Sequence, residues 1–180
     1  MNVVAFDLET TSLTAMIGRV LCCSFKPITK IKSEVYTFRG DDKKFRNHDV
    51  INDSKLVAAI RDELVKYDIL VGHNSKLFDR KFLNGRLFKW GLMPLPSMFH
   101  IDTMWAIRTH IAMSSKLDNV QKHLNLEEAK SPITWDNWAR AGCFDRKAMD
   151  EVVNHCEKDV TVLELAYNRL KPYIRTITRC

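Results

Sequence analysis

The chain has 180 residues, of which 46% are hydrophobic and 28% charged, a composition typical of a soluble globular protein with one core. Its formal net charge of +6 and pI of about 9.1 are compatible with a polyanionic partner such as nucleic acid, but do not require one. No apolar run approaches the roughly 18 residues of a membrane-spanning helix, so we expect no membrane partner. We expect residues 1–180 to form a single domain.

The cysteines indicate a reducing compartment. Their number is odd and none of them form a Cys-x-x-Cys pair, and the residues after Met1 lack the basic flank and cleavage site of a signal peptide. We therefore expect reduced thiols and a cytoplasmic location. The five positions are Cys22, Cys23, Cys143, Cys156 and Cys180.

The first third of the chain predicts three strands. Residues 3–6 form a short, continuous apolar run that is typical of a buried strand. Residues 19–25 and 31–38 are the next candidates, and the link at residues 26–30 suits a hairpin turn. Residues 40–53 are polar and charged, which predicts an exposed loop.

Helices and strands then alternate. A helix is expected from Asp53-Ser54, a buried strand at 69–72, and a helix over 75–90 closed by Gly91. A short strand over 99–101 ends at Asp102. Two further helices are predicted, over residues 116–124 and 145–171. This order predicts an α/β or mixed-sheet domain.

Asp7 and Glu9 lie two residues apart at the end of the first predicted strand. Side chains at that spacing point to the same face of a strand. At 4 Å and an effective dielectric of 20, two carboxylates repel by about 4 kcal/mol, which a bound cation would offset. Oxygen ligands favour hard ions such as Mg²⁺ or Mn²⁺. The alternative is a solvated strand end.

Further acidic residues follow later strands and helices. Asp79 is expected one turn into the helix that follows the strand at 69–72, near the sheet edge where α/β proteins gather ligands. Alternatively, Asp79 interacts only with the helix dipole. His155 and Asp159 are four residues apart on the last predicted helix, and therefore share one face. A solvated or internally satisfied helix histidine is the alternative for His155.

Together these segments resemble the DEDD (DnaQ-like) superfamily of 3′–5′ exonucleases. The matching motifs are FDLETT at residues 6–11, HN-x-x-x-FD at 73–79 and H-x-x-x-DV at 155–160. IDT at 101–103 and KLDNV at 116–120 resemble the branch that is related to family B polymerase proofreading domains. The resemblance implies a ribonuclease H-like fold, with a mixed five-stranded sheet flanked by helices. It also implies a stand-alone exonuclease, since a proofreading polymerase needs a longer chain.

The resemblance implies roles for the acidic residues and His155 in hydrolysis assisted by two Mg²⁺ or Mn²⁺ ions. Asp7 would bridge both ions, Glu9 and Asp159 would hold the ion that activates water, and Asp79 would serve the ion beside the leaving 3′ oxygen. His155 would orient the attacking water or accept its proton, because neutral imidazole is an acceptor near neutral pH.

The resemblance also implies residues that hold the 3′ end. These are Thr10, Leu13 as an apolar wedge, Asn74 at the start of the second-motif helix, and Phe78 as a stacking face. Ordinary packing is the alternative for Leu13 and Phe78, and a plain N-cap for Asn74. Basic residues that follow the second motif would track phosphates or form a solvated helix face; they are Arg80, Lys81, Arg86 and Lys89.

One departure from the family pattern concerns His155. One branch carries Tyr at the position of His155, whereas the other carries His at the position of Asn154. Because one residue turns a helical side chain by about 100°, either His155 reaches the water directly or the helix contains a local bulge.

The expected substrate is the 3′ end of nucleic acid, with single-stranded DNA favoured over RNA. An exoribonuclease of the same fold and a catalytically inactive nucleic-acid-binding module are the alternatives. All four carboxylates are present, which argues against the inactive module. A zinc site at His155 and Cys156 lacks the usual ligand spacing. The sequence identifies no protein partner.

Overall fold

The computed structural model describes residues 1–29, 33–126, 133–174 and 177–179. Its strands form one sheet in the order β3-β2-β1-β4-β5-β6. Strands β1, β4 and β5 are parallel, whereas β2, β3 and β6 run antiparallel to their neighbours. The strands are β1 (Val3–Thr10), β2 (Val20–Ile28), β3 (Tyr36–Arg39), β4 (Ile69–Gly72), β5 (Phe99–Asp102) and β6 (Thr178–Arg179). The expected mixed five-stranded sheet is confirmed, with the two-residue β6 added at one edge.

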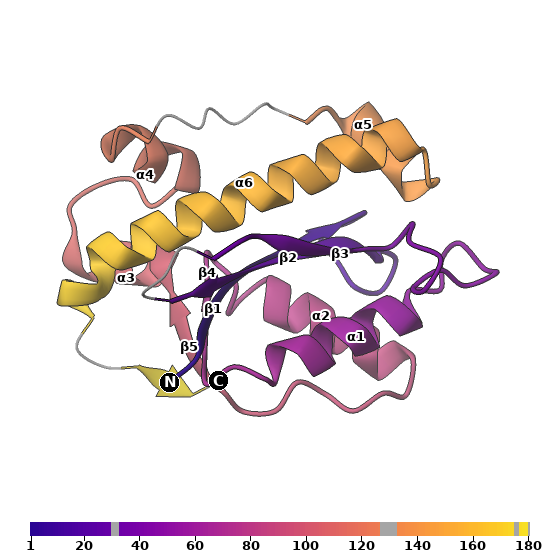
Figure 1. Ribbon diagram of the computed structural model, residues 1–180, viewed down its shortest axis with the longest axis horizontal. Coiled ribbons are helices and arrows are strands. Elements are labelled where there is room, and N and C mark those ends of the chain that lie inside the picture. Colours follow the sequence, from indigo (N-terminus) through magenta and orange to yellow (C-terminus); the bar gives the residue numbers. More distant parts are fainter. Residues whose placement is uncertain (30–32, 127–132, 175–176, 180) are drawn as a thin grey trace.

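Helices cover both faces of this sheet (Figure 1). On one face lie α1 and α2, and on the other the long α6 runs across the strands. The helices are α1 (Ser54–Leu64), α2 (Asp79–Lys89), α3 (Thr103–His110), α4 (Leu117–His123), α5 (Trp135–Gly142) and α6 (Arg146–Leu170), with a 3-10 turn over Lys171–Tyr173. None of the described helices is both long and apolar enough to cross a membrane.

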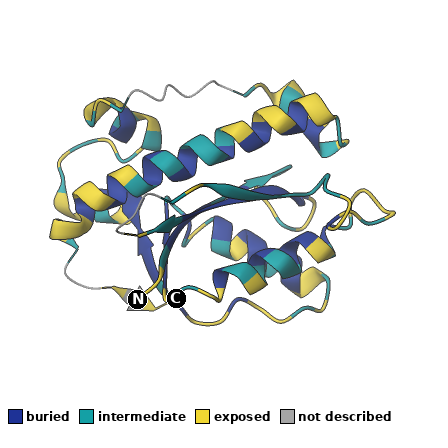
Figure 2. Cartoon of the chain, in the orientation of Figure 1, coloured by how far each residue is buried: buried dark blue, intermediate teal, exposed yellow. Residues whose placement is uncertain are grey.

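Alternation along β1 decides which layer each side chain enters. Val4, Phe6 and Leu8 pack into the core beneath α1 and α2, whereas Ala5 packs on the opposite face with Leu163 of α6. Asp7 and Glu9 share the face of Ala5, because side chains alternate along a strand. Both carboxylates therefore lie under α6, whose inner face is buried (Figure 2).

Three element boundaries and two additional helices differ from the sequence-based prediction. Strand β2 continues to Ile28 in place of the expected turn at 26–30, because Pro27 still pairs in register with Val4. Helix α2 begins at Asp79 and not at 75; the preceding residues form turns. The third strand is Tyr36–Arg39, and residues 31 and 32 of its predicted range lie outside the described residues. Helices α3 and α5 were not predicted.

Candidate active site

The carboxylates of Asp7 and Glu9 lie at the C-terminal part of β1, and Cys156 of α6 faces them. The Cys156 thiol donates to the backbone oxygen of Asp7 at 3.4 Å and to Asp7 Oδ2 at 3.5 Å. One ligand atom from each of these three residues lies within 4.8 Å of the other two. The hydrogen bonds attach α6 to the strand that carries the first motif.

Asp79 reaches the same place from the first turn of α2. Its side chain is buried, and its Oδ1 accepts a hydrogen bond from the backbone N–H of Leu8 at 3.1 Å. The parallel pairing of β1 with β4 ends at Ala5 and Val71, so β4 does not occupy this N–H. The early end of β4 thus makes room for the second motif beside Asp7.

His155 and Asp159 enter the site from α6. His155 Nε2 lies 4.0 Å from Glu9 Oε1 and 3.9 Å from Asp159 Oδ2. Asn154 is exposed, and α6 is an uninterrupted α-helix through this region. The histidine at the tyrosine spacing therefore faces the carboxylates directly, without the helix bulge that was the alternative.

Trp138 is a site residue that sequence reasoning missed. It lies on α5 and packs edge-on against the ring of His155, with ring centroids 6.4 Å apart at 89°. Helix α5 begins after Thr134, whose side chain accepts from the N–H of Asn137 as a helix N-cap. Thr134 and the three-residue spacing of Trp135 and Trp138 were the available signals.

Burial and mutual repulsion dominate the electrostatics of the site. Burial, and next the charge of Asp7, raise the pKa of Glu9 well above its ordinary value. The same two causes raise the pKa of Asp79. Burial also raises the pKa of the Cys156 thiol, which keeps it a hydrogen-bond donor. Such a cluster of oxygen ligands fits a hard divalent cation, whose charge would remove the repulsion.

A second set of residues holds the segment between β4 and α2. Asp102 accepts from the N–H groups of Asn74 at 3.0 Å and Lys76 at 3.1 Å, and it also caps α3. Ser75 Oγ lies 2.8 Å from His100 Nε2, and both residues are buried. These contacts fix the turn that delivers Asp79 to β1.

The predicted substrate-binding residues lie in different settings. Thr10 Oγ1 donates to the carbonyl of Ser12 at 2.8 Å, and Leu13 is 82% exposed. Asn74 adopts a left-handed backbone with a φ of 59°, and Phe78 is the residue at the N-cap of α2. Asn74 is therefore not the N-cap. Phe78 is half-buried and packs against Phe82, with ring centroids 5.7 Å apart.

Arg86 neither tracks phosphates nor lies on a solvated helix face, contrary to both sequence-based alternatives. It is 1% exposed, and its guanidinium donates to Asp53 through Nε at 3.0 Å and Nη2 at 2.8 Å. Its Nη1 also donates to the carbonyl of Ala15 at 3.1 Å. A buried arginine needs a carboxylate partner, and Asp53 supplies one.

Comparisons with known proteins agree with this geometry. A family model described as the RNase_H superfamily matches residues 4–171, so the chain belongs to this superfamily. The family model thereby confirms the predicted resemblance and the ribonuclease H-like fold, which is a nuclease fold.

Two polymerases are among the similar proteins. DNA polymerase III PolC-type from Ureaplasma parvum serovar 3 is 32% identical over 122 residues, which cover 58% of this chain. The family B DNA polymerase of the hyperthermophilic archaeon Pyrobaculum calidifontis shares the fold, with a TM-score of 0.70 and 16% identity over 96% of this chain. The matched regions amount to only 8% and 25% of these two larger proteins.

Proposed function

We propose that this protein is a 3′–5′ exonuclease that hydrolyses phosphodiester bonds at the 3′ end of nucleic acid. The observation that carries the proposal is the convergence of four carboxylates and His155 from β1, α2 and α6, with Asp79 bonded to Leu8 and His155 facing Glu9 and Asp159. Membership of a superfamily with a nuclease fold supports the same reaction. Residues 1–180 would form one exonuclease domain.

Asp7, Glu9, Asp79 and Asp159 would hold two divalent cations, Mg²⁺ or Mn²⁺. When bound, such ions supply electrostatic stabilisation of the attacking and leaving oxygens of the phosphate. The raised pKa of Glu9 and of Asp79 supports this assignment, because burial alone makes an uncompensated carboxylate costly.

His155 would orient the attacking water and accept its proton. Its ring nitrogen is near Glu9 and Asp159, and the edge-on contact with Trp138 limits rotation of the ring. Leu13 protrudes from the loop that follows the first motif, where an apolar side chain would separate the terminal base from its neighbour. Thr10, Asn74 and Phe78 would line the path of the terminal nucleotide.

DNA is the favoured substrate because both named relatives are DNA polymerases. An exoribonuclease of the same fold remains the second candidate, since carboxylates that act on a phosphate do not distinguish the sugars. The free thiols of Cys22, Cys23, Cys143 and Cys156 support a reducing, cytoplasmic setting as part of the proposal.

The deciding experiment uses 5′-end-labelled single-stranded DNA, duplex DNA and RNA, each with Mg²⁺, with Mn²⁺ and with a chelator. We expect stepwise shortening of single-stranded DNA from its 3′ end, slower attack on paired ends, and no reaction with chelator. A paired end must first unpair, which costs a few kcal/mol. Rapid cutting of a closed circular single strand would show an endonuclease, and faster attack on RNA would favour the second candidate.

A further inference from the structure

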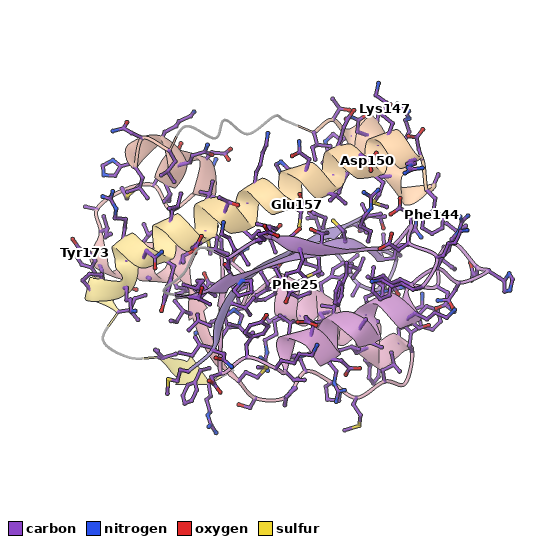
Figure 3. All side chains as sticks on the ribbon, in the orientation of Figure 1. Phe25, Phe144, Lys147, Asp150, Glu157 and Tyr173 are labelled. Atoms are coloured by element: carbon purple, nitrogen blue, oxygen red, sulfur yellow. The ribbon has the colours of Figure 1, made fainter. Side chains whose placement is uncertain are left out.

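A basic groove lies at the N-terminal end of α6, away from the carboxylates. It has a volume of about 360 Å³ and forms where the loop after β3 meets the corner between α5 and α6. Lys43, Arg46, Phe144 and Arg146 line it, and we call this set the corner groove. Figure 3 shows Phe144 at this end of α6, near Lys147, and Figure 1 shows the adjacent loop protruding from the molecule.

The charges around the corner groove do not cancel. Lys43, Arg46 and Arg146 are exposed. Nearby carboxylates are held by other arginines: Arg39 binds Asp41 at 3.0 Å and Asp150 at 2.6 Å, and Arg140 binds Asp145 at 2.8 Å. Arg39, Asp41 and Asp42 also line the groove, and the exposed Lys44 and Lys147 follow Lys43 and Arg146 in the sequence. The surface therefore carries an excess of positive charge that suits a polyanion.

Phe144 is held in an unusual conformation at the centre of this surface. Its φ is 62°, which costs an L-residue about 1–2 kcal/mol. The guanidinium groups of Arg19 and Arg46 stack on its ring, at 4.5 Å and 4.6 Å from the centroid. Stacking orients the Arg46 guanidinium while its in-plane N–H groups remain able to bind phosphate oxygens.

A second hollow is lined by residues next to this corner and by residues next to the first motif. It has a volume of about 290 Å³ and is lined by Thr11, next to the first motif, by Trp138, which contacts His155, and by Arg19. Arg19 is buried and donates to the carbonyl oxygens of Gly142 and Val50, which fixes the corner against the loop. The two hollows share no lining residue, but Arg19 of the second hollow stacks on Phe144 of the corner groove.

The distance between the two ends suits a strand of nucleic acid. Arg146 and His155 are nine residues apart on α6, or about 14 Å along its axis at 1.5 Å per residue. For a single strand stacked as in B-form DNA, whose charges lie 3.4 Å apart along the axis, this span corresponds to about four nucleotides.

We propose that the corner groove binds the phosphate backbone of a single strand, about four nucleotides from the scissile bond. The proposal rests on the proposed function, and it adds a binding site that is separate from the catalytic carboxylates. Lys43, Arg46 and Arg146 contact phosphates, and the groove is indifferent to base sequence because phosphate contacts carry no sequence information.

The test measures binding without metal, so that no strand is cut. Fluorescein-labelled oligothymidylates of about 4 and about 16 nucleotides are titrated in chelator and followed by fluorescence anisotropy. The groove variant is the triple change Lys43→Gln, Arg46→Gln and Arg146→Gln. The control variant, Lys66→Gln, Lys122→Gln and Lys171→Gln, removes the same charge from exposed positions elsewhere.

We expect the groove variant to lose about tenfold in affinity for the long strand, with its salt-dependence slope reduced by about 2, since each lost single-strand phosphate contact removes about 0.7. Mg²⁺-dependent hydrolysis of the short strand should match the wild type, because a strand of about four nucleotides whose 3′ end lies at the carboxylates does not reach the groove. The control should retain wild-type affinity for both strands.

Equal losses in the groove variant and the control would overturn the proposal, because net charge alone would then explain them. Unchanged affinity of the groove variant for the long strand, or a loss of its Mg²⁺-dependent hydrolysis of the short one, would also overturn it. Lack of hydrolysis by the wild-type protein would contradict the nuclease function, while the metal-free binding comparison would still decide the groove.

Discussion

The carboxylate of Asp79 accepts a hydrogen bond from the backbone N–H of Leu8 at 3.1 Å. The two residues are 71 positions apart, and this bond attaches the start of α2 to the strand that carries Asp7 and Glu9. The second motif is thus bonded to the backbone of the first, between the two acidic residues. The arrangement of the carboxylates consequently depends on folding rather than on metal alone.

Replacement of Asp7 should separate catalysis from folding. We expect Asp7→Ala to abolish hydrolysis, because Asp7 is the proposed ligand of both ions and its charge raises the pKa of both Glu9 and Asp79. In chelator its Tm should equal or exceed that of the wild type, because one repelling carboxylate is gone. Asp62→Ala, which removes an exposed carboxylate from α1, is the control. Near-wild-type turnover in Asp7→Ala would refute the active-site assignment.

Glu9 and Asp79 should stabilise the metal-free protein less as the pH rises above their ordinary pKa values. Glu9 and Asp79 have pKa values above the ordinary 4.5 and 3.8, so the folded state binds more protons than the unfolded chain. Their contribution to the free energy of unfolding is thus greatest at low pH and declines as the pH rises from those values through the raised ones.

This pH dependence is measured as Tm against pH in chelator, for the wild type and for Glu9→Gln. The Tm of Glu9→Gln relative to the wild type should increase with pH, because glutamine does not ionise. Added Mg²⁺ should stabilise the wild type most at the higher pH, where the carboxylates are charged. A Tm difference that does not change with pH would show that Glu9 ionises in the folded protein as it does in the unfolded chain.

His155 tests the departure from the family pattern. We expect His155→Ala to lower turnover by roughly 10²–10⁴-fold, the usual contribution of a general base. Metal binding, followed by calorimetry, should persist because the four carboxylates remain. His155→Tyr should retain more activity than His155→Ala, and the acid limb of its pH–rate profile should differ, since tyrosine does not titrate near neutrality. Wild-type rates in His155→Ala would leave His155 without a catalytic role.

The buried ion pair between Arg86 and Asp53 should be important for stability. Arg86→Met leaves Asp53 buried without its counter-ion, so we expect a loss of about 3–5 kcal/mol in the free energy of unfolding. The double variant with Asp53→Leu should lose less than the sum of the single changes. Urea unfolding measures both, with the exposed Lys89→Met on the same helix as the control. Additive losses would indicate that the pair is energetically uncoupled.

The sequence alone determined the strand β1, the shared face of Asp7 and Glu9, and the pairing of His155 with Asp159 on one side of α6. These relationships follow from the periods of strands and helices, which depend only on spacing along the chain. The continuous apolar run at residues 3–6 also predicted a buried strand, and the structure shows apolar residues on both of its faces.

Only the tertiary structure decided which distant residues meet. The thiol of Cys156 bonds to Asp7, Trp138 packs on His155, and Arg86 turns inward to Asp53 instead of facing solvent. From the helix pattern alone, Arg86 was expected either to contact phosphates or to lie on a solvated face. Contacts of this kind depend on how the helices pack across the sheet. Local spacing determines on which face of its helix or strand a residue lies, but not which distant residue covers that face.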